Sequence, residues 1–319
     1  MAKYVGARRE IAFTKEATRL TAETAQAGDW FPHEGYEFKP IVEKVERASA
    51  VGDIVQLRSE DIIAEASEGT VPMILSTEFG GDLANMIMGQ APTSASLGGG
   101  YYSHDYTLLN ANNHLTYTVS TYDPMAGSKK YAGAILNTTS IEYTPDDYVR
   151  TTLELLGGKE ASASLTPSYS TTNRFFRPSM ATFKYASAYS GLAGASTVAI
   201  AGFTLNINKN ATRYMVLGST ESADNANQRI SINGSITLAY EDAAFRAIAL
   251  ANTSEAIQIK LTDGTYIFQI ELPLCTFADW NVAPDLDGYM TNTISFKATG
   301  GDATNGLVKM YVADMSATH

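Results

Sequence analysis

Apolar and polar residues alternate along several stretches of the chain, which is the pattern of strands with one buried face. The alternation is partial in residues 38–45 and 53–66 and clearer in residues 114–123. A longer stretch, residues 256–274, holds two alternating runs separated by Asp263 and Gly264, a pair that favours a β-hairpin turn. The pattern therefore predicts a mainly β protein.

Two short helices are expected among the strands. Residues 70–75 are predicted as a strand, and a helix should begin near Phe79. Apolar residues then recur at three- and four-residue spacing, at Leu83, Met86 and Ile87. Gly89 fits the end of that helix. A second helix is expected over residues 242–250.

Three segments lack a strong strand pattern. Residues 1–37 are polar with mixed charge and include a helix-like run at 14–26, so they are predicted to form an N-terminal arm. Residues 90–110, rich in small residues and glycine, are expected to form a long loop or flexible hairpin. Residues 159–199 are rich in Ser, Thr and Ala and are predicted as a linker.

The order of features recurs in the second half, which indicates an internal duplication. Phe38 to Gly69 spans as many residues as Phe203 to Gly234, since 203 − 38 and 234 − 69 both equal 165. At the same offset Val71 matches Ile236.

A second block supports the same interpretation. Residues 147–155 correspond to 288–296, with Thr152 set against Thr293. We therefore expect two tandem β domains, over residues 38–158 and 200–319, each with a short flanking helix.

The charge balance narrows the possible functions. The chain has 23 Lys and Arg against 34 Asp and Glu, a formal net charge of −11, so it is not expected to bind nucleic acid in the ordinary way. Its one cysteine, Cys275, excludes an internal disulfide framework. No apolar run is long enough for a membrane span, and the N-terminus lacks a signal-peptide pattern, so synthesis in the cytoplasm is expected.

Motifs for catalysis, metal ions or cofactors are missing from the sequence. The four histidines (His33, His104, His114 and His319) are expected in turns, in loops or at the chain end, none at ligand spacing. The segment from Asp285 to Gly288 starts like a calcium loop but lacks its later ligands. Four carboxylates (Glu142, Asp146, Asp147 and Glu154) could form a site for general acid–base catalysis. Their positions are better explained by a solvent-exposed strand face and turn. We predict no enzyme, no cofactor and no metal.

The order of strands, turns and helices resembles the tail tube proteins of long-tailed bacteriophages, of the siphophage major tail protein type. The resemblance lies in residues 131–143, 234–242, 270–274 and 287–298. It implies β-sandwich or barrel domains with a flanking helix. Their subunits form rings whose inner sheets merge into one β-barrel, and the rings stack into a tube with an acidic lumen through which DNA is ejected.

The resemblance also implies partners and places for particular residues. Most members have one tube domain and form hexameric rings, so a duplicated chain should need three copies, a homotrimer with pseudo-sixfold symmetry. Candidate acidic residues facing the lumen are Asp146, Asp147, Glu154 and Asp285, and the candidate inter-ring loop comprises Gly98, Gly99, Gly100, Tyr101 and Tyr102. Expected partners in the virion tail, assembled in the bacterial host, are other copies of the chain and the tape measure, tail tip and terminator proteins. Double-stranded DNA should pass without binding.

Two other classes of protein share parts of this pattern. One is another β-type virion component, such as a capsid decoration or baseplate protein. The other is a carbohydrate-binding β-sandwich, for which Tyr101, Tyr102 and Tyr106 would supply the aromatic contacts.

Overall fold

A computed structural model describes residues 6–47, 59–239, 244–251, 253–283, 291–300 and 305–319. Strands make up 57% and helices 9% of the structure, which confirms the expected mainly β fold. None of the helices in these ranges has the length and apolarity needed to cross a lipid bilayer.

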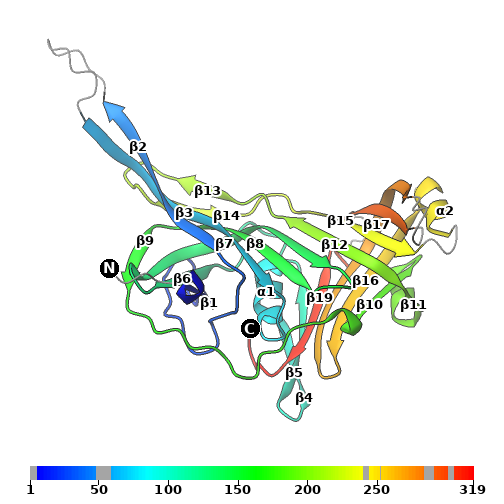
Figure 1. Cartoon of the computed structure of the whole chain (residues 1–319). Coiled ribbons are helices and arrows are strands. Elements are labelled where there is room, and N and C mark those ends of the chain that lie inside the picture. The colour runs from blue at the N-terminus through cyan, green and yellow to red at the C-terminus, as the bar shows by residue number, and fades with distance from the viewer. Residues whose placement is uncertain (1–5, 48–58, 240–243, 252, 284–290, 301–304) are drawn as a thin grey trace.

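The elements are described in chain order (Figure 1). Those of the first half are β1 (Glu10–Lys15), β2 (Glu37–Arg47), β3 (Ser59–Ile74), α1 (Phe79–Met88), β4 (Thr93–Gly98), β5 (Tyr101–Thr107), β6 (Tyr117–Asp123), β7 (Gly127–Tyr143), β8 (Arg150–Gly157) and β9 (Glu160–Ala163). Those of the second half are β10 (Ala181–Ala186), β11 (Thr197–Val198), β12 (Ile200–Asn208), β13 (Thr212–Met215), β14 (Ser222–Ala226), β15 (Ser231–Ala239), α2 (Ala244–Ala251), β16 (Ser254–Asp263), β17 (Tyr266–Ala283), β18 (Thr291–Ala298) and β19 (Lys309–Asp314). Short 3-10 helices cover Gly6–Arg8, Pro178–Met180 and Tyr189–Gly194.

Most strands belong to one large antiparallel sheet. Its central path runs β2–β3–β8–β7–β12–β15–β18–β17, so the two halves of the chain meet where β7 pairs with β12. The two longest strands change neighbours along their length. The first part of β7 pairs with β6 and β9, and the first part of β17 pairs with β16 and β19.

The strand pairings of the first half recur in the second half in the same order. In the first half the pairs are β1–β6, β2–β3, β3–β8, β6–β7, β7–β8 and β7–β9. In the second half they are β10–β16, β12–β15, β15–β18, β16–β17, β17–β18 and β17–β19. Helix α1 follows β3 as α2 follows β15. The hairpins β4–β5 and β13–β14 occupy different positions in the two halves.

Alternation of side chains gives the central sheet one apolar and one polar face. In β8, for example, Leu153 and Leu155 are buried whereas Thr152 and Glu154 are half-exposed. The apolar face packs into a continuous core that also contains α1. The Phe79 ring of this helix contacts the rings of Phe13 and Phe31 from the N-terminal segment.

Several local predictions are confirmed. Helix α1 begins at Phe79 and ends at Met88, followed by Gly89 in the left-handed conformation, whose N–H donates to the Asn85 carbonyl. The expected β16–β17 hairpin is present, and its turn is formed by Gly264 and Thr265, directly after Asp263 at the end of β16. Helix α2 lies within one or two residues of its expected place, although its predicted start at 242–243 falls outside the described residues.

The N-terminal segment differs from the expected arm. Strand β1 pairs with β6, and Phe13 and Trp30 are buried in the core. The run 14–26 is not helical beyond β1, because the buried Glu16 carboxylate accepts hydrogen bonds from distant groups. Its donors include the Thr118 hydroxyl at 2.9 Å and the Gly133 N–H at 2.7 Å, which hold the segment against the sheet.

The other weakly patterned segments also contain strands. Residues 159–199, expected as a linker, include β9, β10 and β11, and β10 forms six residue pairs with β16. Residues 90–110 contain the β4–β5 hairpin, which joins the large sheet through β19. His104 therefore lies in a strand rather than in a loop. These strands are short or polar on their exposed side, so their alternation is weak in the sequence.

Gly69 in β3 and Gly234 in β15 occupy corresponding positions in the strand pairs β2–β3 and β12–β15. A Cβ on Gly69 would lie 2.0 Å from the carbonyl oxygen of Glu37, and a Cβ on Gly234 would lie 2.0 Å from that of Thr204. We expect Gly69→Ala and Gly234→Ala each to lower the free energy of unfolding by about 2 kcal/mol or more, because the neighbouring backbone must move. Urea unfolding measures the loss. Gly194→Ala is the control, since nothing lies within 4 Å of its Cβ position, and an equal loss there would contradict the steric explanation.

Lys209 is buried between the two halves of the chain. It follows β12, its Nζ donates to the carbonyl oxygen of Met86 in α1 at 2.5 Å, and only 1% of its surface is exposed. Burial, together with the smaller effect of the positive charge on Arg19, lowers its pKa to about 7. Between pH 7 and 10 the unfolded chain therefore binds a proton at this lysine that the folded chain does not bind.

This difference in proton binding predicts a pH dependence. From pH 7 to pH 9 the wild type should gain about 2 kcal/mol of unfolding free energy relative to Lys209→Met, because stability rises with pH wherever the unfolded state binds more protons. Urea unfolding at both pH values measures the change. Lys39→Met, at an exposed position in β2, should follow the wild type, and a parallel pH dependence of Lys209→Met would contradict the assignment.

Candidate functional site

The polar face of the central sheet is dominated by neutral side chains. Rows of paired residues carry Ser, Thr and Asn across β7, β12, β15 and β18: Thr138 and Ser140; Thr204, Asn206 and Asn208; Asn233, Ser235 and Thr237; and Thr293 and Ser295. Among the described side chains, the charged residues on the face are Glu37, Lys39, Glu43, Glu68, Glu142, Arg150, Glu154 and Lys297. Such a surface offers hydroxyl and amide groups with little net charge.

The carboxylates predicted from the sequence do not form one cluster. Glu154 lies on the polar face, where its carboxylate accepts hydrogen bonds from Asn137 at 3.1 Å and from Thr138 at 2.6 Å. Asp146 is exposed in the turn between β7 and β8. Asp147 lies in the same turn, and the hydrogen bond from Arg150 lowers the pKa of its carboxyl. Asp285 lies outside the described residues.

A second feature is a pair of hairpins that extend from the sheet. The β2–β3 hairpin projects well beyond the rest of the molecule, at the upper left of Figure 1. It exposes apolar side chains on both strands: Val42, Val45, Ile62 and Ile63. The β13–β14 hairpin lies beside β3, where the Glu65 N–H donates to the Thr220 carbonyl at 2.7 Å. It also exposes apolar residues, Tyr214 to Leu217.

The candidate inter-ring loop forms the tip of the β4–β5 hairpin, at the lower edge of the molecule in Figure 1. Gly98, Gly99 and Gly100 all have positive φ, as a tight connection between these strands requires. Tyr101 packs edge-on against Tyr266 at 5.8 Å, and Tyr102 pairs with Asp314 of β19. The two tyrosines therefore hold the tip of the hairpin against β17 and β19, and Leu97 is an exposed apolar residue beside them.

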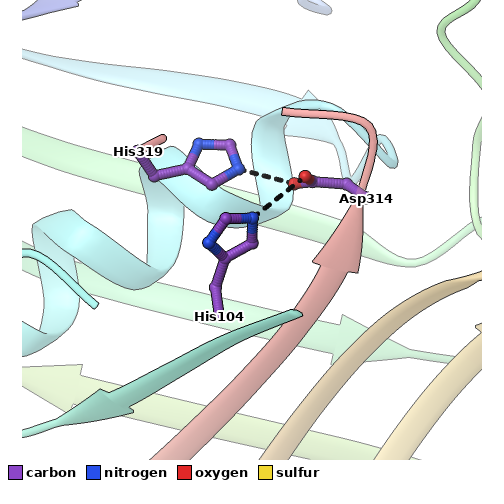
Figure 2. Close-up of side chains that lie close together, drawn as sticks. All are labelled: His104, Asp314 and His319. Atoms are coloured by element: carbon purple, nitrogen blue, oxygen red, sulfur yellow. Dashed lines mark hydrogen bonds and ion pairs between the residues drawn. The ribbon is translucent and has the colours of Figure 1, made fainter. Parts of the chain in front are cut away.

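A third feature is a buried cluster that sequence analysis missed. The imidazoles of His104 and His319 both contact the carboxylate of Asp314 (Figure 2). His319 Nε2 lies 2.6 Å from Asp314 Oδ2, and His104 Nε2 lies 3.3 Å from Asp314 Oδ1. The two rings meet edge to face at 4.6 Å. His104 is separated from the other two residues by more than 200 positions, and the β5–β19 pairing brings them together.

Burial and charge act in opposite directions in this cluster. Burial alone would lower the pKa of His319, but the hydrogen bond and charge of Asp314 raise it overall. Burial alone would raise the pKa of Asp314, but hydrogen bonds from both histidines lower it overall. The two imidazoles and the carboxylate thus shift one another's proton affinity, and they have little contact with solvent.

His104 also connects to a hydroxyl. Its Nδ1 lies 2.8 Å from the Ser94 Oγ, so Ser94, His104 and Asp314 form a chain of hydroxyl, imidazole and carboxylate groups. Nucleophilic catalysis uses such a chain next to a substrate pocket. The pocket beside this cluster is lined by His319, Asp314 and Asp82 and not by Ser94, so the hydroxyl does not face it. The geometry gives no positive evidence of catalysis.

Comparison with known proteins agrees with the fold. No curated protein matches the chain. The family model described as phage tail tube protein matches residues 6–298, which include every strand from β1 to β18. That family is structural rather than enzymatic and places its members in the virion tail. The chain therefore belongs to the phage tail tube protein family.

Proposed function

We propose that the chain assembles into stacked rings that form the tail tube, and that DNA passes through the tube during ejection. The observation that carries the proposal is the β7–β12 pairing, which joins two similar sheets into one. Among the described residues, β2 and the last part of β17 each have a partner on one side only, so a strand edge is open at each end of the central path. Unpaired edges favour association with further strands, and a closed ring removes them. Tape measure, tail tip and terminator proteins are the proposed neighbours in the tail.

The two halves are proposed to be copies of one tube domain. Support comes from the repeated pairings and from equal registers: Val71 pairs with Leu153, and Ile236 pairs with Ile294. These positions differ by 236 − 71 = 165 and 294 − 153 = 141 residues. Three chains would then supply six domains, the basis of the proposed trimeric ring.

If the two halves are copies, the pairing of β7 with β12 within one chain predicts how β17 pairs with β2 of the next chain in the proposed ring. Gly69 pairs with Phe38 and Gly234 pairs with Leu205, so β12 corresponds to β2 at an offset of 205 − 38 = 167, two residues from the offset inferred from the sequence. Asn206 of β12 pairs with Ser140 of β7. The corresponding pair between chains is Lys39 of β2 with Asn281 of β17, because 206 − 167 = 39 and 140 + 141 = 281.

The polar face is proposed to line the lumen. It is rich in neutral Ser, Thr and Asn side chains, and among the described residues it carries five carboxylates (Glu37, Glu43, Glu68, Glu142 and Glu154) against three cations (Lys39, Arg150 and Lys297). Phosphates bind mainly through Lys and Arg, so this surface should let DNA slide. The conduit is proposed to be nearly neutral in this region and only slightly acidic.

Stacking of rings is assigned to the β2–β3 and β13–β14 hairpins. Both expose apolar side chains, and the β2–β3 hairpin extends beyond the sheet from which it arises. Contiguous exposed apolar surface marks contact sites, and the proposed occupant is the adjacent ring of the same chain. The β4–β5 hairpin remains the alternative inter-ring contact.

The proposed ring register predicts a specific cross-link. In chains carrying Lys39→Cys and Asn281→Cys, mild oxidation should produce disulfides between chains, because directly opposite residues of antiparallel strands have their Cβ atoms close together. Denaturing electrophoresis should show covalent species of up to three chains. Species of up to six chains would contradict the trimer.

Two matched variants control this experiment. Asn206→Cys with Ser140→Cys should form a disulfide within one chain and so shows that the conditions suffice. Lys39→Cys with Thr293→Cys places the second cysteine one strand further away and should not cross-link. Failure of the Lys39–Asn281 pair while the intrachain pair forms would reject the proposed edge pairing.

If these hairpins join adjacent rings, substitutions in them should block the stacking of rings into tubes without blocking ring formation. Val42→Glu with Ile62→Glu puts charge on the exposed apolar part of the β2–β3 hairpin and should allow rings but prevent tubes, because buried carboxylates are costly in a contact. Negative-stain electron microscopy distinguishes the two forms. Leu97→Glu, on the β4–β5 hairpin, should still form tubes. Loss of tubes only in Leu97→Glu would move the contact to that hairpin.

A further inference from the structure

We propose that His104, Asp314 and His319 form a binding site for one divalent transition-metal ion, for which Zn²⁺ is the best fit, and that the ion fastens the segment after β19 to β5. Among the residues that the structure describes, these three are the one group of at least three His, Cys, Asp or Glu side chains with suitably close ligand atoms. The proposal does not depend on tube assembly.

The ligand atoms are already near a coordination geometry. They all lie within 4.8 Å of one another, and two of the separations are 2.6 Å and 3.3 Å. Tetrahedral Zn²⁺ with ligands at about 2.0–2.1 Å requires separations of roughly 3.4 Å. A bound ion would require the 2.6 Å separation between His319 and Asp314 to widen. Two imidazoles and one carboxylate are a ligand set that Zn²⁺ uses in proteins, with a fourth position open to water.

The surroundings supply the outer contacts that a metal-binding histidine needs. A ligand imidazole binds through one nitrogen while the other holds a hydrogen bond that fixes the ring. His104 Nε2 lies 3.3 Å from Asp314 Oδ1 and 3.0 Å from the carbonyl oxygen of Ser316, and its Nδ1 lies 2.8 Å from the Ser94 Oγ. With the metal on Nε2, the proton resides on Nδ1 and is donated to Ser94. The ring is wholly buried, so this orientation is held by packing as well.

A route for a cation leads to the cluster. A pocket of about 520 Å³ is lined by Asp314 and His319 and by three further carboxylates, at Asp29, Glu78 and Asp82. Lys15 is the lysine in its lining, so carboxylates outnumber it. A cleft lined mainly by one sign of charge concentrates ions of the opposite sign. The ion can therefore enter from the side of α1, where Asp82 lies in the first turn.

Without a metal, the same residues would form only a hydrogen-bonded cluster. Two observations favour the metal: the Nε2 atoms of both histidines lie close to the same carboxylate, that of His104 being shared with the Ser316 carbonyl oxygen, and an acidic pocket opens onto the cluster. A purely structural cluster needs neither a pocket nor two imidazoles on one carboxylate. Bound metal would link β5, β19 and the segment carrying His319, which strand pairing alone does not hold.

The site is tested on tag-free full-length protein treated with a chelator and then dialysed. Titration of Zn²⁺ against a chromophoric chelator should give one ion per chain, and Co²⁺ should give the intense visible absorption of a four-coordinate site. Excess Mg²⁺, which prefers six oxygen ligands, should not displace the ion. Zn²⁺ should raise the thermal unfolding midpoint of the wild type.

Variants distinguish the site from general surface binding. His319→Ala, at a half-buried position, and Ser94→Ala should each weaken Zn²⁺ binding at least tenfold, the first by removing a ligand and the second by removing the outer hydrogen bond. His33→Ala removes a histidine outside the cluster and should bind as the wild type does. Equal Zn²⁺ binding by the wild type and His319→Ala, or an absence of binding by the folded wild type, would overturn the proposal.

Discussion

The backbone pairing of β7 with β12 is the contact on which the arrangement of the molecule depends. Six residue pairs join the two halves there, so they share one sheet instead of packing as separate bodies. The register also decides which side chains face which way. Thr204 and Asn206 continue the polar face of β7, and a slip of one residue would bring Leu205 and Ile207 to that face instead.

Long strands then let the sheet enclose its own apolar side. Both β7 and β17 exchange one set of neighbours for another along their length, and each has a register shift near the exchange, after Leu136 in β7 and after Ala278 in β17. Such irregularities bend a strand and increase its twist. The core can therefore form between the central path and the strands β6, β9, β16 and β19. Lys209 shows how closely the halves fit, since its ammonium group reaches a carbonyl of α1 inside that core.

Sequence patterns predicted the parts of the fold that depend on neighbouring residues. The limits of α1 follow from apolar spacing and Gly89, and the β16–β17 hairpin follows from Asp263 and Gly264. Strands β1 and β10 were missed because each is short and is held mainly by its partner. Of the candidate lumen carboxylates, Glu154 lies on the polar face. The His104 cluster could not be predicted, since His104 and Asp314 meet only through the β5–β19 pairing and no local spacing signals that contact.

The β4–β5 hairpin illustrates what a joined pair of domains can do that separate domains cannot. It arises between α1 and β6, whereas in the second half α2 leads directly into β16. Identical single-domain subunits must repeat every surface loop at each position around a ring, where large loops crowd one another. In the proposed ring, a chain with two unequal halves would carry such a loop at alternate positions, which would leave space beside each one. The symmetry of the proposed barrel and the symmetry of its outer surface would then differ.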